Sequence, residues 1–141
     1  MLCNANVMDR MFSRIRLINQ IIIFILGEYF MIIKTLQEKD DKYISQAAGL
    51  LVDGFKDNWP NGWPNLTSAL EEVNECLSLD RICRIVIDEN DNVVGWIGGI
   101  SQYDGNVWEL HPLVVDIKHR RKGIGTLLVK DLEEEVRKRG G

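Results

Sequence analysis

This chain has few cysteines and no excess of basic side chains, and each of these two facts excludes a class of protein. The three cysteines, Cys3, Cys76 and Cys83, are odd in number and have no C-x-x-C spacing, which argues against a disulfide framework and against a zinc site. We therefore expect reduced thiols in a cytoplasmic protein, and no metal. Acidic side chains outnumber basic ones and give a net charge of -4. This charge argues against nucleic acid as the main partner and is compatible with a polycationic small molecule.

The chain also lacks an apolar run long enough to cross a membrane. The longest run, Ile21 to Leu26, follows three arginines and imitates a signal peptide. It is too short to span a bilayer, and no small-residue cleavage site follows it. Residues 26–30, Leu-Gly-Glu-Tyr-Phe, could be encoded by a purine-rich ribosome-binding sequence ahead of Met31. We therefore expect residues 1–30 to be a translated leader or non-native extension, residues 31–141 to form the domain, and no membrane to be involved.

Hydrophobic periodicity predicts a single α/β domain, which suits the 141 residues of the chain. The first helix is expected to begin after Asp40 as its N-cap. The second is expected to begin at Thr67 or with a Ser68–Glu71 capping box. The expected elements, in order, are a strand over 31–36, two helices, strands over 82–88, 93–101 and 107–115, and a helix over 124–139.

The turn between the last strand and the last helix holds the most informative motif. Residues 120–126 are Arg-Arg-Lys-Gly-Ile-Gly-Thr, so a strand, a cationic glycine turn and a helix start follow one another. Unpaired N–H groups at a helix N-terminus, with the positive end of the helix dipole behind them, bind phosphate or pyrophosphate. A nucleotide P-loop is excluded because no lysine follows Gly125. A dinucleotide fingerprint is excluded because Leu128 stands where a third glycine is required.

Arg120, Gly123 and Gly125 form an R-x-x-G-x-G motif that resembles the acyl-coenzyme A motif of the GCN5-related N-acetyltransferases. The segment before it, Trp108-Glu109-Leu110-His111-Pro112-Leu113-Val114-Val115, is similar to the bacterial aminoglycoside 6'-N-acetyltransferase branch of that superfamily. The similarity extends over roughly residues 31–141 and includes Gly95-Trp96-Ile97-Gly98-Gly99. This long match is more specific than the short glycine motif.

The resemblance implies the acyl-coenzyme A N-acyltransferase fold of the superfamily, an α/β architecture with a mixed, mainly antiparallel sheet. It also implies acetyl-coenzyme A as the cosubstrate. The cofactor-binding residues that it implies are Val115, Arg120, Arg121, Lys122, Gly123, Ile124, Gly125 and Thr126. Because members of the family continue with further strands, we expect this chain to lack the C-terminal strands of the fold.

Glu109 is the first candidate for the chemistry. On a strand that leads to the anion-binding turn, its carboxylate can face an acceptor cleft, bind a cationic amine and accept its proton. Without the resemblance, an exposed edge-strand glutamate is the simpler interpretation. The resemblance makes Glu109 the substrate-binding carboxylate and the proposed base.

His111 and Leu113 follow on the same strand, and alternation predicts that both share a face with Glu109. His111 either orients substrate and relays a proton or is a structural histidine held by a backbone carbonyl. Pro112 removes a hydrogen-bond donor in mid-strand, which predicts a bulge or splay there. The resemblance then assigns the backbone N–H of Leu113 to the thioester oxygen, while Cys76 and Cys83 are expected to be packing residues.

Asp57, Trp59 and Trp63 form the other candidate wall of an acceptor site. Exposed indoles beside a carboxylate suit a flat, polyhydroxylated polycation, which can stack and form ion pairs at once. Each indole taken singly fits equally well a Trp-Pro loop packed on the sheet. Together with Glu109, these residues are the predicted substrate-binding set.

The resemblance implies transfer of an acetyl group from acetyl-coenzyme A to the 6'-amine of aminoglycosides by direct attack of the amine, with antibiotic resistance as the consequence. A homodimer is expected. Two alternatives stay open. One is the same reaction on another small-molecule or protein amine, and the other is an inert, truncated module that binds coenzyme A or forms a dimer.

Overall fold

A computed structural model describes residues 16–18 and 21–141 of the chain. The strands in it are β1 (Arg16–Ile18), β2 (Ile21–Leu26), β3 (Tyr29–Thr35), β4 (Arg81–Ile87), β5 (Val93–Gln102) and β6 (Val107–Val115). The helices are α2 (Asp41–Phe55), α3 (Leu66–Cys76) and α4 (Ile124–Lys138), with short 3-10 turns η1 (Tyr103–Gly105) and η2 (Ile117–His119). From β3 onward, the predicted order of strands and helices is confirmed. No helix within these residues is long and apolar enough to cross a membrane.

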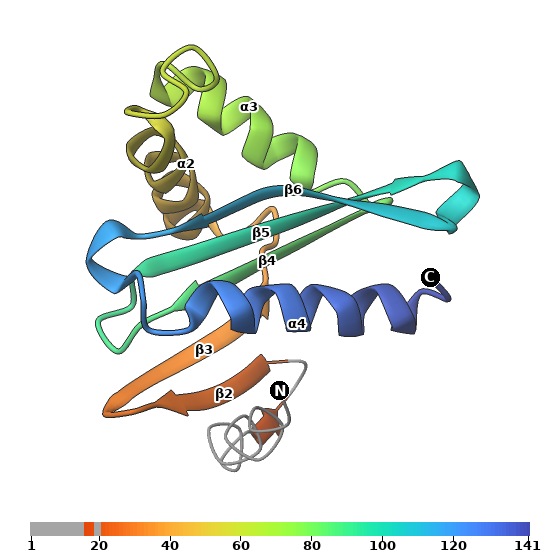
Figure 1. The fold of residues 1–141 in the computed structure, drawn as a ribbon, viewed down its shortest axis with the longest axis horizontal. Coiled ribbons are helices and arrows are strands. Elements are labelled where there is room, and N and C mark those ends of the chain that lie inside the picture. The colour runs from red at the N-terminus through yellow and green to blue at the C-terminus, as the bar shows by residue number, and fades with distance from the viewer. Residues whose placement is uncertain (1–15, 19–20) are drawn as a thin grey trace, which may run out of the picture.

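The six strands form one sheet in the order β1-β2-β3-β4-β5-β6. Every pair of neighbours among the described strands is antiparallel. Helices α2 and α3 lie on one side of the sheet and α4 lies on the other (Figure 1). The predicted α/β architecture with a mainly antiparallel sheet is therefore confirmed.

Both faces of the sheet are buried, which explains why β4 is apolar at every position except Arg81 and Arg84. On one face, Ile85 and Ile87 pack with α2 and α3 in a cluster that we call the α2–α3 core. On the other face, Ile82 and Val86 pack against α4 in the α4 core. Because successive side chains of a strand point to opposite faces, a strand between two helical layers needs apolar residues at nearly every position.

A buried ion pair fastens α4 to the sheet. The guanidinium of Arg84 in β4 donates to Asp131 of α4 from Nε to Oδ2 at 2.7 Å and from Nη2 to Oδ1 at 2.9 Å. Its remaining nitrogen, Nη1, donates to Oγ1 of Thr35 at 2.9 Å. Both charged side chains are almost fully buried, so the bidentate geometry compensates each charge where water cannot reach it.

The starts of the first two helices differ in detail from the prediction. Asp40 is the N-cap residue of α2, but its side chain makes no capping bond. Instead, its Oδ2 accepts a hydrogen bond from the backbone N–H of Gln37 and pairs with Lys34. The predicted cap of α3 at Thr67 or Ser68 is wrong, because Asn65 caps this helix through its Oδ1, which accepts from the N–H of Ser68 at 2.9 Å.

Residues 21–30, which the sequence assigns to a leader, take part in the sheet. β2 pairs with β3 in a hairpin, and its Phe24 and Leu26 are 1% and 5% exposed in the α4 core. The rest of the predicted leader lies outside the described residues, apart from the short strand β1. The packing makes β2 a contributor to the core, and the origin of the segment stays a prediction.

We predict that Phe24→Ala lowers the free energy of unfolding by about 3–5 kcal/mol, because the removed ring leaves a cavity against α4. Phe30→Ala is the matched control, because this ring is 43% exposed and its loss should change stability by only about 0.5 kcal/mol. Urea unfolding followed by circular dichroism measures both. Equal midpoints for the two variants would contradict the core position of β2.

Candidate active site

The turn between β6 and α4 presents free backbone amides at one end of the molecule. Gly123 is the N-cap of α4 and has φ +89°, a left-handed conformation that strains any residue with a Cβ. The first intrahelical hydrogen bond runs from the N–H of Leu127 to the carbonyl of Gly123 at 3.0 Å. The amides of Ile124, Gly125 and Thr126 precede it, so they have no intrahelical acceptor. These three amides lie where the sequence predicts an anion-binding site, at the positive end of the α4 dipole.

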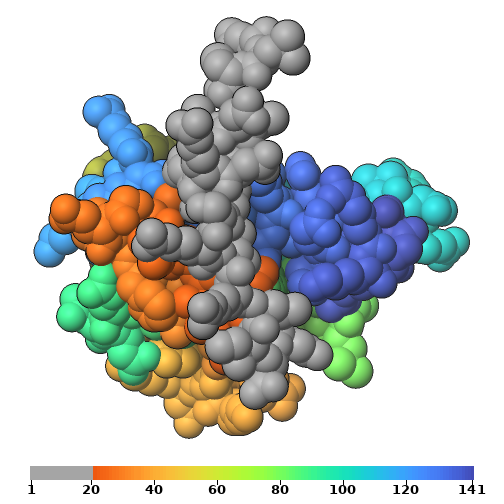
Figure 2. Space-filling view, turned by 90° about the horizontal axis from the view of Figure 1, so that it is seen from below, coloured from red at the N-terminus to blue at the C-terminus, as the bar shows by residue number. Residues whose placement is uncertain are grey.

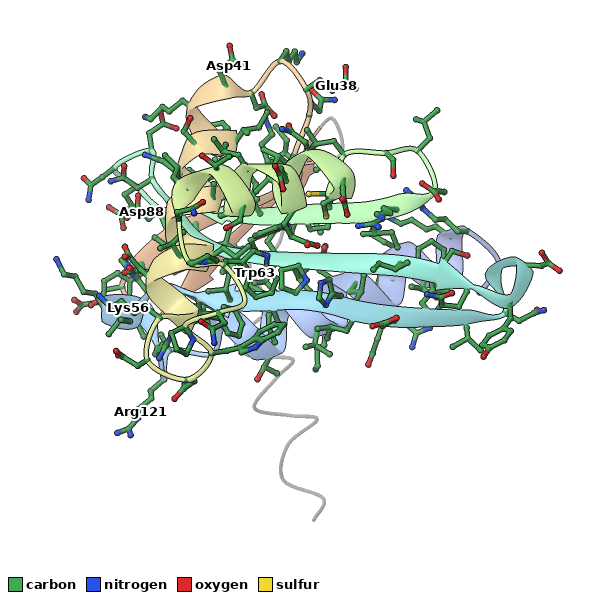
Figure 3. All side chains as sticks on the ribbon, turned by 90° about the horizontal axis from the view of Figure 1, so that it is seen from above. Glu38, Asp41, Lys56, Trp63, Asp88 and Arg121 are labelled. Atoms are coloured by element: carbon green, nitrogen blue, oxygen red, sulfur yellow. The ribbon has the colours of Figure 1, made fainter. Side chains whose placement is uncertain are left out.

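The three cationic side chains of the turn leave it in different directions. Arg120 folds back onto β6, where its Nε donates to the carbonyl of Val115 at 3.2 Å. Arg121 has a positive φ of 64°, and its side chain extends from the fold into solvent (Figure 3). The Nζ of Lys122 lies 4.0 Å from the centre of the Tyr29 ring. The predicted cofactor residues from Val115 to Thr126 thus lie on one continuous turn, although not all their side chains face one point.

His119 fixes this turn to its neighbours. Its Nδ1 lies 2.7 Å from Oδ2 of Asp116, and its Nε2 lies 3.8 Å from Oδ2 of Asp88 in the β4–β5 turn. Asp116 in turn donates its N–H to the carbonyl of Val94 at 2.8 Å. The turn is therefore attached both to β5 and to the β4–β5 turn before any ligand arrives.

The predicted irregularity at Pro112 is confirmed. Ile97 of β5 pairs with Leu113 and Gly99 pairs with Leu110, so one residue of β5 faces two residues of β6 at His111 and Pro112. This extra residue interrupts the ladder as a β-bulge does. The His111 carbonyl then comes so close to Gly98 that a Cβ at Gly98 would lie 2.2 Å from its oxygen. Only glycine fits at this position of β5.

The bulge changes which face each side chain takes. Glu109 pairs with Ile100 and lies on the face covered by α3, as does His111, which contacts Glu72 of α3. Leu113 instead packs against the α4 core. The prediction that Leu113 shares the face of Glu109 and His111 is therefore wrong, because the extra residue at Pro112 shifts the alternation by one.

His111 is held between α3 and the loop that precedes it. Its Nε2 lies 3.3 Å from Oε1 of Glu72, and its ring centre lies 5.9 Å from that of Trp63. Glu72 was not among the residues predicted from the sequence. A signal existed, since Ala69, Val73 and Cys76 are the buried positions of α3 and helical spacing places Glu72 beside them, with only 15% of its side chain exposed.

The two indoles of the loop between α2 and α3 have different environments. Trp63 is 8% exposed and lies between the loop and the sheet (Figure 3). Trp59 packs edge-on against Trp63 at 5.2 Å between ring centres and is 54% exposed. Trp63 thus has the packing role that the sequence left open, while Trp59 and the exposed Asp57 stay accessible to a ligand.

Glu109 lies on the open part of β6, past the end of the helical cover. Its side chain is exposed, and its Oε2 accepts a hydrogen bond from Nε2 of Gln102 at 3.4 Å. Because β6 is the last strand in the sheet order, the carboxylate is accessible from the edge of the sheet. The same strand therefore presents Glu109, the bulge and Val115 in succession toward the anion-binding turn.

The described cysteines are packing residues. Cys76 and Cys83 are buried in the α2–α3 core. The hydrogen bond with Cys76, together with burial, raises the pKa of the Cys83 thiol well above its usual value. A protonated thiol is a poor nucleophile. Within residues 16–18 and 21–141, no group of three or more His, Cys, Asp or Glu side chains is placed to hold a metal ion.

Known proteins share this fold and part of this sequence. A family model described as Acetyltransferase (GNAT) family matches residues 50–141. An aminoglycoside 6'-N-acetyltransferase complexed with coenzyme A is 38% identical, with a TM-score of 0.68 over 77% of this chain and 57% of that one. The aminoglycoside 6'-N-acetyltransferase from Enterococcus faecium is also 38% identical, with a TM-score of 0.66 over the same shares of the two chains.

More distant structures agree on the fold alone. An aminoglycoside antibiotic 6'-N-acetyltransferase from Acinetobacter baumannii is 18% identical, with a TM-score of 0.60 over 78% of this chain and 74% of that one. No curated protein sequence matches the chain. The chain spans 57% of the length of the two structures that are 38% identical to it.

We predict that Gly98→Ala destabilises the fold by about 1–3 kcal/mol, because the new methyl group meets the backbone carbonyl of His111, which cannot move without disturbing the bulge. Gly49→Ala in α2 is the control. No atom lies within 4 Å of a Cβ at Gly49, so alanine should stabilise this helix by roughly 0.5–1 kcal/mol. Thermal unfolding of both variants measures the difference. A Gly98→Ala variant as stable as Gly49→Ala would contradict the close approach at the bulge.

Proposed function

The chain belongs to the acetyltransferase (GNAT) family, and we propose that it transfers an acetyl group from acetyl-coenzyme A to the 6'-amine of an aminoglycoside. GNAT enzymes use acetyl-coenzyme A as the acetyl donor. The single observation that carries the proposal is the continuity of β6 with the anion-binding turn, which puts a carboxylate, a bulge and three free amides on one path. Two relatives that are 38% identical and are aminoglycoside 6'-N-acetyltransferases support the choice of acceptor.

The residues of the turn fit a pyrophosphate. Glycine is required at position 123 by the positive φ of Gly123. At position 125, neither the backbone conformation nor the packing requires glycine. A Cβ at Gly125 would meet only Cγ2 of Val115 at 3.9 Å, an ordinary contact. Glycine in a helix costs roughly 1 kcal/mol relative to alanine. Close approach of a ligand to the amides of the first turn accounts for a glycine that the packing does not need.

On this proposal, each residue of β6 has a separate role. Val115 pairs through its backbone with the pantetheine arm, and the N–H of Leu113 donates to the thioester oxygen as negative charge develops there. Glu109 binds the ammonium group of the acceptor and accepts its proton. Direct attack of the amine on the thioester carbon expels the thiolate, so no nucleophile of the protein takes part. Leu113 acts through its backbone, and its side chain serves the α4 core.

His111 has a positioning role in this scheme. The contacts with Glu72 and Trp63 hold its ring beside the bulge. They keep the ring in one orientation. The backbone carbonyl of the same residue lies against Gly98. The ring and, through Trp63, the indole of Trp59 then line the acceptor site on the face of β6 that also carries Glu109.

Acetylation of another small-molecule or protein amine is the second candidate. It is favoured by the burial of Trp63, which leaves one of the two predicted stacking indoles for the acceptor. An open edge lined by a glutamate and one exposed indole recognises a cationic amine without requiring several sugar rings. For the first candidate, acetylation of an aminoglycoside, we also propose that the protein is a homodimer, lies in the cytoplasm and confers antibiotic resistance.

Release of coenzyme A thiol, followed with a chromogenic disulfide in the presence of acetyl-coenzyme A, tests the proposal. The 141-residue chain should release thiol with aminoglycosides that carry a 6'-amine and not with analogues that carry a 6'-hydroxyl group. Glu109→Gln should lower kcat/KM ten-fold or more, since a lost charge-assisted hydrogen bond is worth roughly 1.5–3 kcal/mol. The control is Glu133→Gln on the exposed face of α4, which should leave the rate unchanged.

Each result separates the candidates. Turnover with simple polyamines or lysine peptides but not with aminoglycosides would favour the second candidate. Tight binding of coenzyme A in calorimetry without turnover on any amine would favour the inert binding module. Wild-type kinetics in Glu109→Gln would remove Glu109 from the acceptor site.

A further inference from the structure

Tyr29 presents an exposed aromatic ring beside the anion-binding turn. It is the first residue of β3, and 44% of its surface is exposed. The Nζ of Lys122 lies 4.0 Å from the centre of the ring, so the lysine leaves the turn toward the β2–β3 hairpin. A cation over an exposed ring adds little stability of its own. Both groups therefore stay available to a ligand.

The hairpin end that carries Tyr29 is held in place by a second contact. Oε1 of Glu89, in the β4–β5 turn, accepts a hydrogen bond from the N–H of Phe30 at 2.9 Å. The same β4–β5 turn carries Asp88, which faces His119 of the anion-binding turn. Figure 2 shows the orange atoms of the hairpin, the blue atoms of the anion-binding turn and the green atoms of the β4–β5 turn at one end of the molecule. The three turns form a single surface.

Because successive side chains of a strand alternate, Tyr29 and Phe30 of β3 lie on opposite faces of the sheet. Met31 and Ile33 of β3 are buried in the α4 core, so Tyr29 lies on the face of the sheet that α4 covers. Phe30 lies on the other face. The two rings have nearly equal exposure, 44% and 43%, but only the ring of Tyr29 points to the side from which α4 presents its amides.

The pyrophosphate of coenzyme A joins two arms that must leave it in different directions. The proposed path of the pantetheine arm follows β6 from Val115. The N-terminal part of α4 packs over β5, where Ile124 and Leu128 would touch a Cβ at Gly95. In the sheet order, β6 lies on one side of β5, and β4 and β3 lie on the other. A nucleotide arm that leaves α4 on the side away from β6 therefore meets Tyr29 and Lys122.

We propose that Tyr29 and Lys122 form the subsite for the adenosine 3'-phosphate end of coenzyme A. The purine stacks on the exposed ring of Tyr29, which every base can do because each has a π-face. The ammonium group of Lys122 moves from the ring to the 3'-phosphate, a dianionic acceptor that attracts it more strongly than the ring does. This inference rests on the proposed function, because it names the second half of the same ligand.

The charges around the subsite suit this ligand. Arg121 extends into solvent from the neighbouring position of the turn (Figure 3) and adds a second positive charge. Of the nearby carboxylates, Glu89 is occupied by the N–H of Phe30, and Asp88 accepts from two amides of its own turn and faces His119. These acidic groups are engaged with donors of the protein, so their repulsion of a phosphate is reduced.

Calorimetric binding of three probes to the 141-residue chain tests the subsite. The probes are coenzyme A, dephospho-coenzyme A, which lacks the 3'-phosphate, and 4'-phosphopantetheine, which lacks the whole 3',5'-ADP part and keeps one phosphate of the pyrophosphate. Tyr29→Ala should weaken both nucleotide probes about ten-fold, the scale of a lost base stack, and leave 4'-phosphopantetheine unchanged. Tyr29→Phe should retain the affinity. Phe30→Ala is the matched control and should bind all three probes as the wild type does.

Lys122→Gln separates the two phosphate groups of the ligand. It should weaken coenzyme A about ten-fold and dephospho-coenzyme A little, so that the two affinities converge. An equal loss for both probes would place Lys122 on the pyrophosphate and overturn its assignment to the 3'-phosphate. Unchanged binding in Tyr29→Ala would overturn the stacking site while coenzyme A binding itself stands. A wild-type chain that binds none of the probes would overturn the proposed function as well.

Discussion

The ion pair between Arg84 and Asp131 sets the position of α4, and the rest of the site depends on that position. A bidentate pair with both partners buried allows one placement of the helix along β4, because any shift would leave a charge without its partner in an apolar layer. Gly95 and Gly99 of β5 let the helix approach closely, since a Cβ at either would come within about 3 Å of Leu128 or Leu132. The result is a helix N-terminus fixed at the end of β6.

β6 connects this N-terminus to the acceptor side of the site. Near Val115, β6 pairs regularly with β5 and leads directly into the turn before α4. At His111 and Pro112, where the thioester would lie, the bulge interrupts this pairing. The missing Cβ of Gly98 leaves room for the backbone carbonyl of His111. Glu72 of α3 contacts the imidazole of the same residue. One irregular strand between two regular layers therefore carries both the donor and the acceptor parts of the proposed reaction.

Much of the fold could be predicted because it depends on local patterns. The apolar stretches of β4 and β5, the helical spacing in α2 and the glycine turn before α4 are visible in short windows of sequence, and the structure confirms these elements. The face of Leu113 was predicted wrongly, because the alternation was continued through Pro112, where the extra residue opposite Gly98 shifts it by one. The burial of Trp63 depends on Phe55 and His111, which meet it only in the folded state. The contribution of β2 to the α4 core was missed because residues 1–30 were assigned to a leader on the ribosome-binding sequence that could encode residues 26–30, and the apolar run at 21–26 was not considered as a buried strand.

The central claim is that the first turn of α4 binds the pyrophosphate of coenzyme A through its backbone. Amide chemical shifts of the 15N-labelled chain during titration with coenzyme A test it most directly. The account predicts saturating shifts, with the largest changes at the N–H groups of Ile124, Gly125 and Thr126. Saturable binding that leaves these three amides unperturbed while others shift would contradict it.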